Sequence, residues 1–264
     1  MTVVSMQMID GEVVSLDRVT ISFPVYQGGS RSLKKRVLFH GSAGRIGRDA
    51  SDQVVIEALR DVSFSLAAGD RVALIGANGA GKTTLLRAIA GIYEPVRGEV
   101  VTRGRISPMF DISLGIDSDL SGFDNIRLRA LLLGLNSAEI ECRLNEIVEF
   151  TELGDYLEMP VRTYSAGMIL RLGFTVSTCF EPDILLMDEW ILAADAHFLG
   201  KAEARVRSFV ERARVMVLAS HNLELCNRWC TKGIWLDQGT VREIGPIDEI
   251  ARRYQEFASG TEAR

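Results

Sequence analysis

The chain has 264 residues, of which 47% are hydrophobic and 25% charged, and its formal net charge is −5. This composition is ordinary for a soluble globular protein with enough core for one large or two small domains. The negative balance argues against a general nucleic-acid binder, and no apolar run reaches the roughly 18 residues of a membrane span or resembles a signal peptide. The four cysteines lack metal-site spacing, so we expect free thiols in a cytoplasmic protein.

The N-terminal part of the chain predicts two strands with a basic segment between them. Residues 13–25 largely alternate apolar and polar side chains, which predicts an antiparallel strand, and residues 54–66 predict another. Residues 28–48 contain six basic residues and no acid. This segment is either a solvated loop or a basic amphipathic segment that lies near anionic lipid headgroups or a membrane partner.

A glycine-rich loop follows the next short strand, which is expected at residues 71–75. The pattern G-x-x-x-x-G-K-[ST] of a P-loop is matched by Gly76, Ala77, Asn78, Gly79, Ala80, Gly81, Lys82, Thr83 and Thr84. Backbone N–H groups of such a loop surround phosphates, and the lysine ammonium meets the outer ones. Residues 85–90 continue as a helix that ends at Gly91. An aromatic ring at Phe23 or Tyr26 could either stack on an adenine or simply pack.

The middle of the chain changes composition. Short strands are expected at 99–103 and 105–110, and then helices at 125–133 and 137–150 with a last turn before Pro160. Ser137 is the expected N-cap of the second helix, with Glu139 in its first turn. Because this helical block interrupts an α/β pattern, we expect it to form a subdomain.

A second phosphate-directed helix end is expected after this block. The segment consists of Tyr164, Ser165, Ala166, Gly167 and Met168. Ser165 can cap the next helix, and the small residues after it leave the N-terminal N–H groups open. Taken alone, the same pattern also fits an ordinary serine-capped apolar helix.

Two carboxylates follow the apolar run at residues 184–187. This run predicts a buried parallel strand, whose carboxyl end is where open α/β sheets bind ligands. Asp188 is suited to hold Mg²⁺ beside the Thr83 hydroxyl, and Glu189 to accept a proton from an attacking water or orient it.

The C-terminal part predicts a helix from Asp195 to Ala213, a buried strand at 215–219 and then His221. His221 is either structural or a hydrogen-bonding partner of a γ-phosphate. A hairpin of strands at 232–237 and 239–244 and a helix at 246–258 complete the chain.

These motifs together resemble the nucleotide-binding subunit of an ABC transporter over about residues 13–250. The resemblance makes Tyr164 to Met168 the signature segment, Asp188 and Glu189 the Walker B acids, Asp195 the D-loop residue and His221 the switch histidine. It implies an α/β P-loop NTPase fold with a mixed-sheet RecA-like core, an antiparallel β subdomain and an inserted helical subdomain. The expected parts of this single domain are 13–110, 122–180, 181–245 and 246–264.

Departures from the general family pattern narrow the resemblance. The signature reads Y-S-A-G-M, Trp190 follows the Walker B acids, and the insertion at 25–55 and the segment Tyr93-Glu94-Pro95 are similar to ATPases that export polysaccharides and polyol phosphates. No glutamine lies between Val96 and Asp155, so Asp111 is the nearest substitute for the Q-loop glutamine and a third candidate magnesium ligand. From its length, we expect the chain to lack the extra C-terminal carbohydrate-binding domain that some members of this family carry.

The resemblance also implies an assembly. Two copies would form a head-to-tail homodimer that binds two ATP molecules, each between the P-loop of one copy and the signature segment of the other. Two permease subunits would bring this ATPase to the cytoplasmic face of the membrane, where ATP hydrolysis drives export of a polysaccharide or lipid-linked glycan. Two alternatives are an ABC ATPase that exports a peptide, drug or lipid, and a non-transport ABC protein acting on ribosomes or DNA.

Overall fold

The computed structural model describes residues 11–24, 45–48, 54–109, 115–188 and 196–260. Tyr26, most of the basic segment 28–48, Asp111, Glu189 and Asp195 therefore lie outside the described residues. The chain divides into two compact units, residues 1–104 with 214–264 (unit 1) and residues 105–213 (unit 2). Each unit is described by itself.

Unit 1 contains a four-stranded antiparallel sheet in the order β2-β3-β1-β5. The strands are β1 (Glu12–Pro24), β2 (Arg45–Arg48), β3 (Val54–Ala67) and β5 (Arg97–Thr102). The predicted antiparallel strand at 13–25 is confirmed, since β1 pairs with both β3 and β5. β2 was not predicted, because the sequence indicates either a loop or an amphipathic segment at these residues.

Unit 1 also contains a mixed sheet in the order β10-β9-β4-β8. These strands are β4 (Arg71–Ile75), β8 (Val215–Ala219), β9 (Lys232–Asp237) and β10 (Thr240–Pro246). β4 runs parallel to both β8 and β9, and β9 and β10 form the predicted antiparallel hairpin. The buried side chains of β4 and β8 make nearly continuous apolar runs, as a parallel strand covered on both faces requires.

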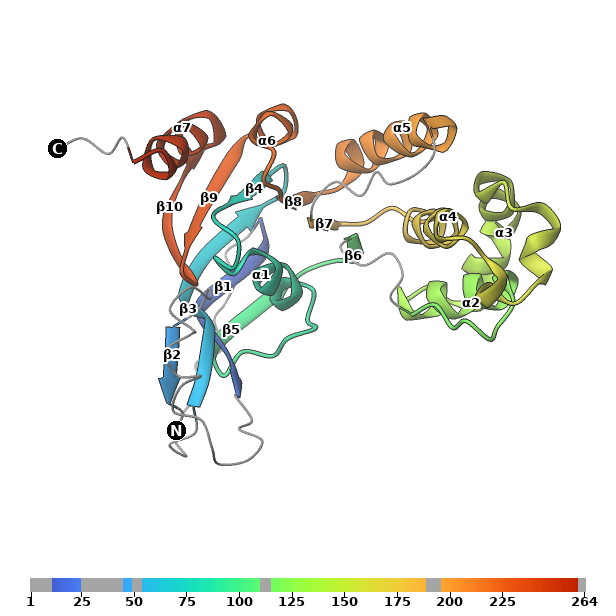
Figure 1. Cartoon of the computed structure of the whole chain (residues 1–264), viewed down its shortest axis with the longest axis horizontal. Helices are drawn as coiled ribbons and strands as arrows, with labels where there is room; N and C mark the ends of the chain where they lie inside the picture. Colours follow the sequence, from blue (N-terminus) through green and yellow to red (C-terminus); the bar gives the residue numbers. More distant parts are fainter. Residues whose placement is uncertain (1–10, 25–44, 49–53, 110–114, 189–195, 261–264) are drawn as a thin grey trace. The chain divides into compact units, whose positions relative to one another are not determined.

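In the part of unit 1 that the structure describes, the sheets are accompanied by three α-helices, α1 (Lys82–Ile89), α6 (Leu223–Trp229) and α7 (Ile247–Ala258). α1 packs against β3, β5 and β8, and α7 packs against β9 and β10 (Figure 1). α6 was not predicted. It begins at the N-cap Asn222, whose side chain accepts a hydrogen bond from Leu225 N at 3.0 Å.

The described residues of unit 2 form a parallel strand pair and four α-helices. The strands are β6 (Ile106–Met109) and β7 (Ile184–Asp188), and the helices are α2 (Gly122–Leu132), α3 (Ser137–Thr151), α4 (Ala166–Ser177) and α5 (Ala196–Arg212). Two 3₁₀ turns at Gly154–Glu158 and Val161–Thr163 connect α3 to α4. The predicted helical block and the strand before the Walker B acids are therefore present.

One local prediction in unit 2 is wrong. Asn136, not Ser137, is the N-cap of α3: its side chain accepts a hydrogen bond from Glu139 N at 3.0 Å, and the Glu139 carboxylate accepts one from Asn136 N at 2.8 Å. This reciprocal capping box satisfies two N–H groups at once, which a cap at Ser137 could not do with Glu139. The hydrogen bond from Asn136 N holds the pKa of Glu139 below its ordinary value.

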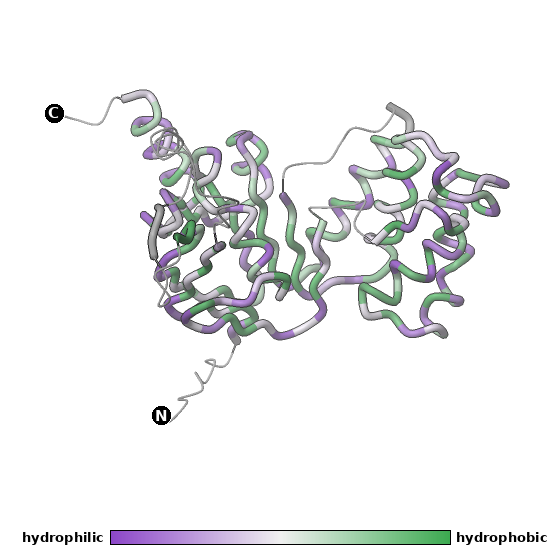
Figure 2. Tube along the Cα trace, turned by 60° about the horizontal axis from the view of Figure 1, so that its bottom comes forward, coloured by the Kyte–Doolittle hydropathy of each residue, from purple (hydrophilic) through white to green (hydrophobic). Residues whose placement is uncertain are grey.

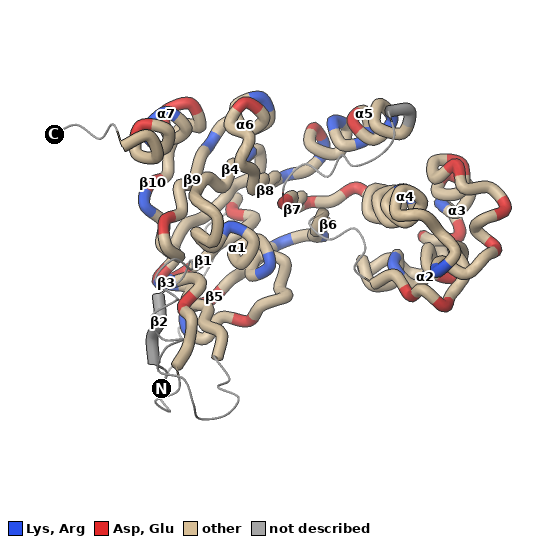
Figure 3. The backbone as a smooth tube through the Cα atoms, in the orientation of Figure 1, with Lys and Arg blue, Asp and Glu red and all other residues tan. Residues whose placement is uncertain are grey.

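Hydrophobic and hydrophilic residues alternate along the trace in both units, which is the pattern expected of elements that cover a core on one side (Figure 2). The core of unit 2 joins α2, α3, α4 and the two 3₁₀ turns around Ile126, Ile147 and Leu172. Acidic residues outnumber basic ones on α3, which has four glutamates and one arginine (Figure 3). No helix among the described residues is both long and apolar enough to cross a bilayer.

Candidate functional site

The P-loop lies between the end of β4 and the start of α1. α1 begins directly after Gly81, which has φ +108° and makes no side-chain cap, so the first N–H groups of the helix have no side-chain oxygen from that position. The Lys82 side chain is almost buried and donates to the carbonyl oxygens of Gly76 at 2.7 Å and Ala77 at 3.1 Å. A helix N-terminus and a buried ammonium in one loop form an anion site, so these residues fit a bound phosphate.

Two positions of the loop require glycine, because a different backbone carbonyl group lies close to each of them. A Cβ on Gly76 would lie 2.3 Å from the Leu236 carbonyl oxygen, and a Cβ on Gly81 would lie 2.8 Å from the Ala58 carbonyl oxygen. Both neighbours are backbone atoms, which cannot move aside as a flexible side chain would. The loop is therefore enclosed by β9 on one side and β3 on the other.

The hairpin turn after β9 supports the P-loop, and the sequence did not reveal this role. Gly239 N donates to the Ala80 carbonyl oxygen at 3.0 Å, and Gly239 O accepts from Arg60 N at 2.8 Å. Gly239 has φ +80°, and a Cβ there would lie 2.7 Å from the Ala58 carbonyl oxygen. The only available sequence signal was the turn at 237–239, which indicates a hairpin but not its contact.

The structure brings His221 to the same sheet edge as the P-loop. β4 and β8 are parallel neighbours that pair Leu74 with Ala219, so Gly76 and His221 each follow a paired residue by two positions. The carboxyl ends of the two strands therefore deliver the loop and the histidine side by side. His221 is exposed, and the preceding Ser220 accepts a hydrogen bond from Asn222 N at 3.1 Å.

The signature segment forms the start of α4 in unit 2. The prediction that Ser165 caps this helix is confirmed, because its Oγ accepts a hydrogen bond from Met168 N at 3.3 Å. Ser165, Ala166 and Gly167 are exposed. A Cβ on Gly167 would meet no atom nearer than the Ser165 Oγ at 3.9 Å, so the fold itself does not require glycine at this position. Its missing side chain keeps the helix N-terminus accessible.

Tyr164 has a different role from the other four signature residues. Only 8% of it is exposed, it belongs to the core of unit 2, and its hydroxyl donates to the Tyr156 carbonyl oxygen at 2.5 Å. Burial raises the pKa of this hydroxyl above its ordinary value. A Cβ on Gly122 would lie 2.3 Å from the same hydroxyl. Tyr164 thus anchors the segment, and the exposed residues after it remain the candidates for ligand contact.

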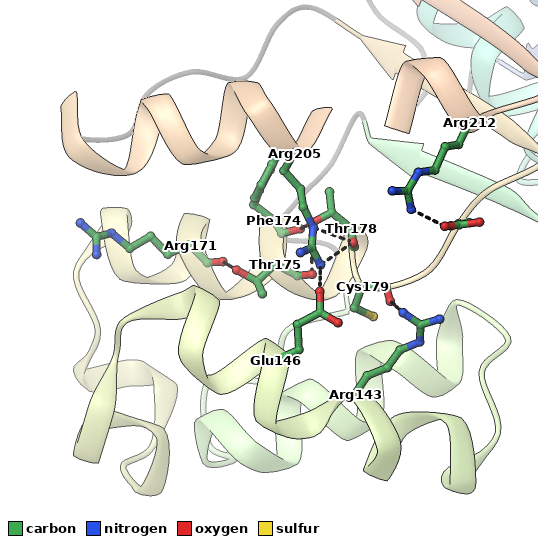
Figure 4. Close-up of polar contacts among 10 residues, drawn as sticks. Arg143, Glu146, Arg171, Phe174, Thr175, Thr178, Cys179, Arg205 and Arg212 are labelled. Carbon is green, nitrogen blue, oxygen red and sulfur yellow. Dashed lines mark hydrogen bonds and ion pairs between the residues drawn. The ribbon is translucent and has the colours of Figure 1, made fainter. Parts of the chain in front are cut away.

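The opposite end of the signature helix is held by arginines from two other helices (Figure 4). Arg143 of α3 donates to the Cys179 carbonyl oxygen at 2.6 Å. Arg205 of α5 donates to the Thr178 carbonyl oxygen at 2.9 Å and also forms an ion pair with Glu146 of α3 at 2.6 Å. Cations at a helix C-terminus satisfy its orphan carbonyl groups and complement its dipole. α4 is therefore fixed at the end away from Ser165.

The first turns of α1 and α4 share an electrostatic feature. Neither contains an acidic residue. Among the described helices the same is true of α5, whereas the first turns of α2, α3, α6 and α7 each contain at least one acid. An acid at that position would compensate the helix dipole and repel an anion. The two helix starts chosen from the sequence as phosphate sites are thus both left positive.

Asp188 ends β7, which pairs in parallel with β6 through Met109 and Met187, and it is half-buried. A carboxylate at the carboxyl end of a parallel strand fits a magnesium ligand, as does the hydroxyl of Thr83 in the first turn of α1. Phe23 is the described member of the aromatic pair and lies half-buried near the end of β1.

Comparisons with known proteins agree with this arrangement. The ABC transporter family model matches residues 59–192. The chain is 44% identical over 225 residues to the O-antigen export system ATP-binding protein RfbE of Yersinia enterocolitica, covering 85% of this chain and 94% of that protein. It is 35% identical over 244 residues to the teichoic acids export ATP-binding protein TagH of Listeria monocytogenes, covering 92% of this chain and 70% of that protein.

A solved structure of similar fold is the dimeric ATP-binding cassette MJ0796 in a post-hydrolysis state with ADP and Pi. The match has a TM-score of 0.62 at 20% identity and covers 89% of this chain and 98% of that one. It supports the α/β fold, with a mixed sheet, an antiparallel sheet and a helical part, that the motifs predict. The family match and the relatives also confirm the resemblance drawn from those motifs, and the chain belongs to the ABC transporter family.

Proposed function

We propose that the chain is the ATP-binding and ATP-hydrolysing subunit of an exporter for a polysaccharide or lipid-linked glycan. ATP binding is supported by the loop around Lys82, where a buried ammonium lies beside a helix N-terminus that has no side-chain cap. The observation that favours a glycan is the 44% identity with an O-antigen export ATP-binding protein over nearly its whole length. Exporters of a peptide, drug or lipid remain the alternative, and a non-transport ABC protein is the more distant one.

Each residue in the proposed site has a distinct task. Lys82 and the N–H groups of the P-loop bind the phosphates, and Phe23 or Tyr26 stacks on the adenine. Glu189 accepts a proton from the attacking water, and His221 donates a hydrogen bond to the γ-phosphate. Mg²⁺ would neutralise phosphate charge and is assigned to Thr83 and Asp188, with Asp111 as a further candidate.

The proposed active form is a head-to-tail homodimer. Two phosphate-directed helix starts in one chain are explained if the P-loop of one copy and Ser165 to Met168 of another bind the same ATP. ATP then joins two positive helix ends that otherwise repel each other, and Asp195 in the D-loop lies at the same contact. Hydrolysis and phosphate release weaken the contact and reopen the dimer. The four parts at 13–110, 122–180, 181–245 and 246–264 belong to this one nucleotide-binding domain.

The dimer is proposed to work at the cytoplasmic face of the membrane with two permease subunits, and without nucleic acid as a partner. The test is to co-purify the chain with its permease and to measure ATP hydrolysis in lipid vesicles. We expect lipid-linked glycans to stimulate hydrolysis, while peptides and unglycosylated lipids do not. Lys82→Ala serves as the inactive control. Stimulation only by peptides or plain lipids would assign the exporter to the alternative substrate class.

A further inference from the structure

Tyr93 connects the end of β1 to the P-loop helix. Its ring lies edge to face with that of Phe23, with centroids 5.2 Å apart and an interplanar angle of 74°. Arg87 of α1 donates to the Tyr93 hydroxyl at 3.0 Å, and its guanidinium carbon lies 5.7 Å from the Tyr93 ring centroid. The backbone N–H of Tyr93 also donates to the Arg87 carbonyl oxygen at 3.3 Å. One helical residue therefore fixes both ends of the tyrosine.

Phe23 is connected to the P-loop through the neighbouring strand β3. A Cβ on Gly81 would lie 2.9 Å from Leu59 Cδ2, and Leu59 of β3 pairs with Ile21 of β1. Phe23 is two residues further along β1, which corresponds to about 7 Å of strand. Arg87 follows Lys82 by five residues in α1, or about 7.5 Å of helix. Phe23 is thus connected to the P-loop through β3, and Tyr93 is connected to it through Arg87 of α1.

We propose that Tyr93 is a positioning residue for the nucleotide base, which holds the Phe23 ring in the orientation that stacks on adenine. This inference rests on the proposed function, since it needs ATP in the P-loop. Phe23 is only half-buried, so fixing its side chain in one orientation has an entropy cost that binding would have to meet. The edge-to-face contact removes part of that cost before ATP arrives.

The link to α1 distinguishes this role from simple packing. Tyr93 has its side-chain and backbone hydrogen bonds to the helix that starts at the phosphates, so the orientation of Phe23 is set by the same element that fixes the triphosphate. The Tyr93-Glu94-Pro95 segment has no task in the proposed hydrolysis. If Tyr93 acts only on the base, its substitution must change the affinity for ATP. It must leave unchanged the affinity for a ligand that has the phosphates but no base.

The test compares two ligands of the full chain by titration calorimetry: MgATP, and inorganic tripolyphosphate, which has phosphates but no base. For Tyr93→Leu we expect the ATP affinity to fall about three- to tenfold and the tripolyphosphate affinity to stay the same. Tyr93→Phe keeps the ring and should lose about twofold or less for ATP. Tyr254→Leu is the matched control, because Tyr254 is also half-buried and edge to face with Trp235, at 5.7 Å. It should change neither affinity.

A double variant shows whether Tyr93 acts through Phe23. If it does, Phe23→Leu combined with Tyr93→Leu binds ATP as weakly as Phe23→Leu alone. Additive losses, equal losses for both ligands, or an unchanged ATP affinity in Tyr93→Leu would each overturn the inference. An unchanged ATP affinity in Phe23→Leu would also overturn it, while the P-loop assignment stands. The proposed function fails separately, if Lys82→Ala still binds both ligands normally.

Discussion

Arg205 of α5 donates two hydrogen bonds to the backbone carbonyl oxygen of Thr178, at 2.9 and 3.1 Å. Thr178 is the C-cap of α4, the helix that starts with the signature segment. The same guanidinium lies 4.8 Å from the centroid of the Phe150 ring in α3. One side chain thus joins three helices of unit 2.

Replacing Arg205 by alanine should therefore destabilise the protein. Its side chain is only 19% exposed, so its hydrogen bonds are poorly replaced by water, although its partner Glu146 is 48% exposed and the ion pair itself adds little. We expect a loss of about 2 kcal/mol, or a melting temperature lower by about 4–8 °C. Scanning calorimetry of the full chain measures this change.

Arg207→Ala is the matched control for this prediction. It lies on the same helix and makes an i,i+4 ion pair with Glu203 at 3.8 Å, but its side chain is 55% exposed. The expected loss is about 0.5 kcal/mol or less. Equal melting temperatures for the two variants would show that the contact with Thr178 contributes nothing.

Gly76→Ala should weaken ATP binding with the chain still folded. The added methyl group would lie 2.3 Å from the Leu236 carbonyl oxygen, so the start of the P-loop must move. We expect the ATP affinity to fall at least about tenfold, measured by titration calorimetry. Gly91→Ala is the control: Gly91 has φ +72° but open space around it, so alanine there costs backbone strain without touching the loop. If both variants bind ATP equally, the steric account of the loop is wrong.

The sequence predicted best those elements whose signals are local. β4 and β8 were placed to the residue because short apolar runs between polar turns define buried parallel strands. α6 was missed because seven residues are too few to show helical periodicity. The cap of α3 was misplaced by one position because Asn136 and Ser137 are both good caps, and only the three-dimensional contact with Glu139 decides between them.

In the candidate site, too, the sequence predicted the local features and missed the long-range contacts. The P-loop and the Ser165 cap follow from spacing alone. The contact of Gly239 with Ala80 joins residues 159 positions apart, and no local pattern predicts it. The burial of Tyr164 depends on Gly122 and Tyr156 in the same way, so the sequence could not separate this residue from its exposed neighbours.

The cysteines should differ strongly in reactivity. Cys142 is exposed, whereas burial raises the pKa of Cys179 and of Cys226 to about 11. The thiolate is the reactive form, so at pH 8 a thiol reagent should label Cys142 quickly and the other two only on unfolding. Burial keeps these thiols neutral in the folded chain, whereas they ionise at a lower pH in the unfolded chain. Their raised pKa therefore favours the folded state fully at pH values below the pKa of the unfolded thiol. That stability is then lost as the pH rises from about 8.5 towards 11. Rapid labelling of Cys226 in the folded chain would contradict this assignment.

Glu189→Gln should keep ATP binding and lose hydrolysis. Glutamine retains the shape of the side chain but cannot accept a proton, so the rate of phosphate release should fall about a hundredfold or more. Glu181→Gln is the control, since Glu181 is exposed and pairs with Arg212. Near-normal turnover by Glu189→Gln would remove it from the proposed catalytic role.

Mixing two inactive variants tests whether the site is shared between copies. Ser165→Asp keeps an N-cap for α4 but places a carboxylate where the proposed γ-phosphate binds, and Lys82→Ala removes the ammonium from the other half of the site. In a head-to-tail dimer of one chain of each kind, both defects fall in one site and the other site is intact. Half of the dimers in an equal mixture are of this kind, so about a quarter of all sites should be complete. The mixture should then hydrolyse ATP at up to about a quarter of the wild-type rate, although each variant alone is inactive. If the mixture is no more active than its components, each chain hydrolyses ATP with its own residues and the shared-site proposal is wrong.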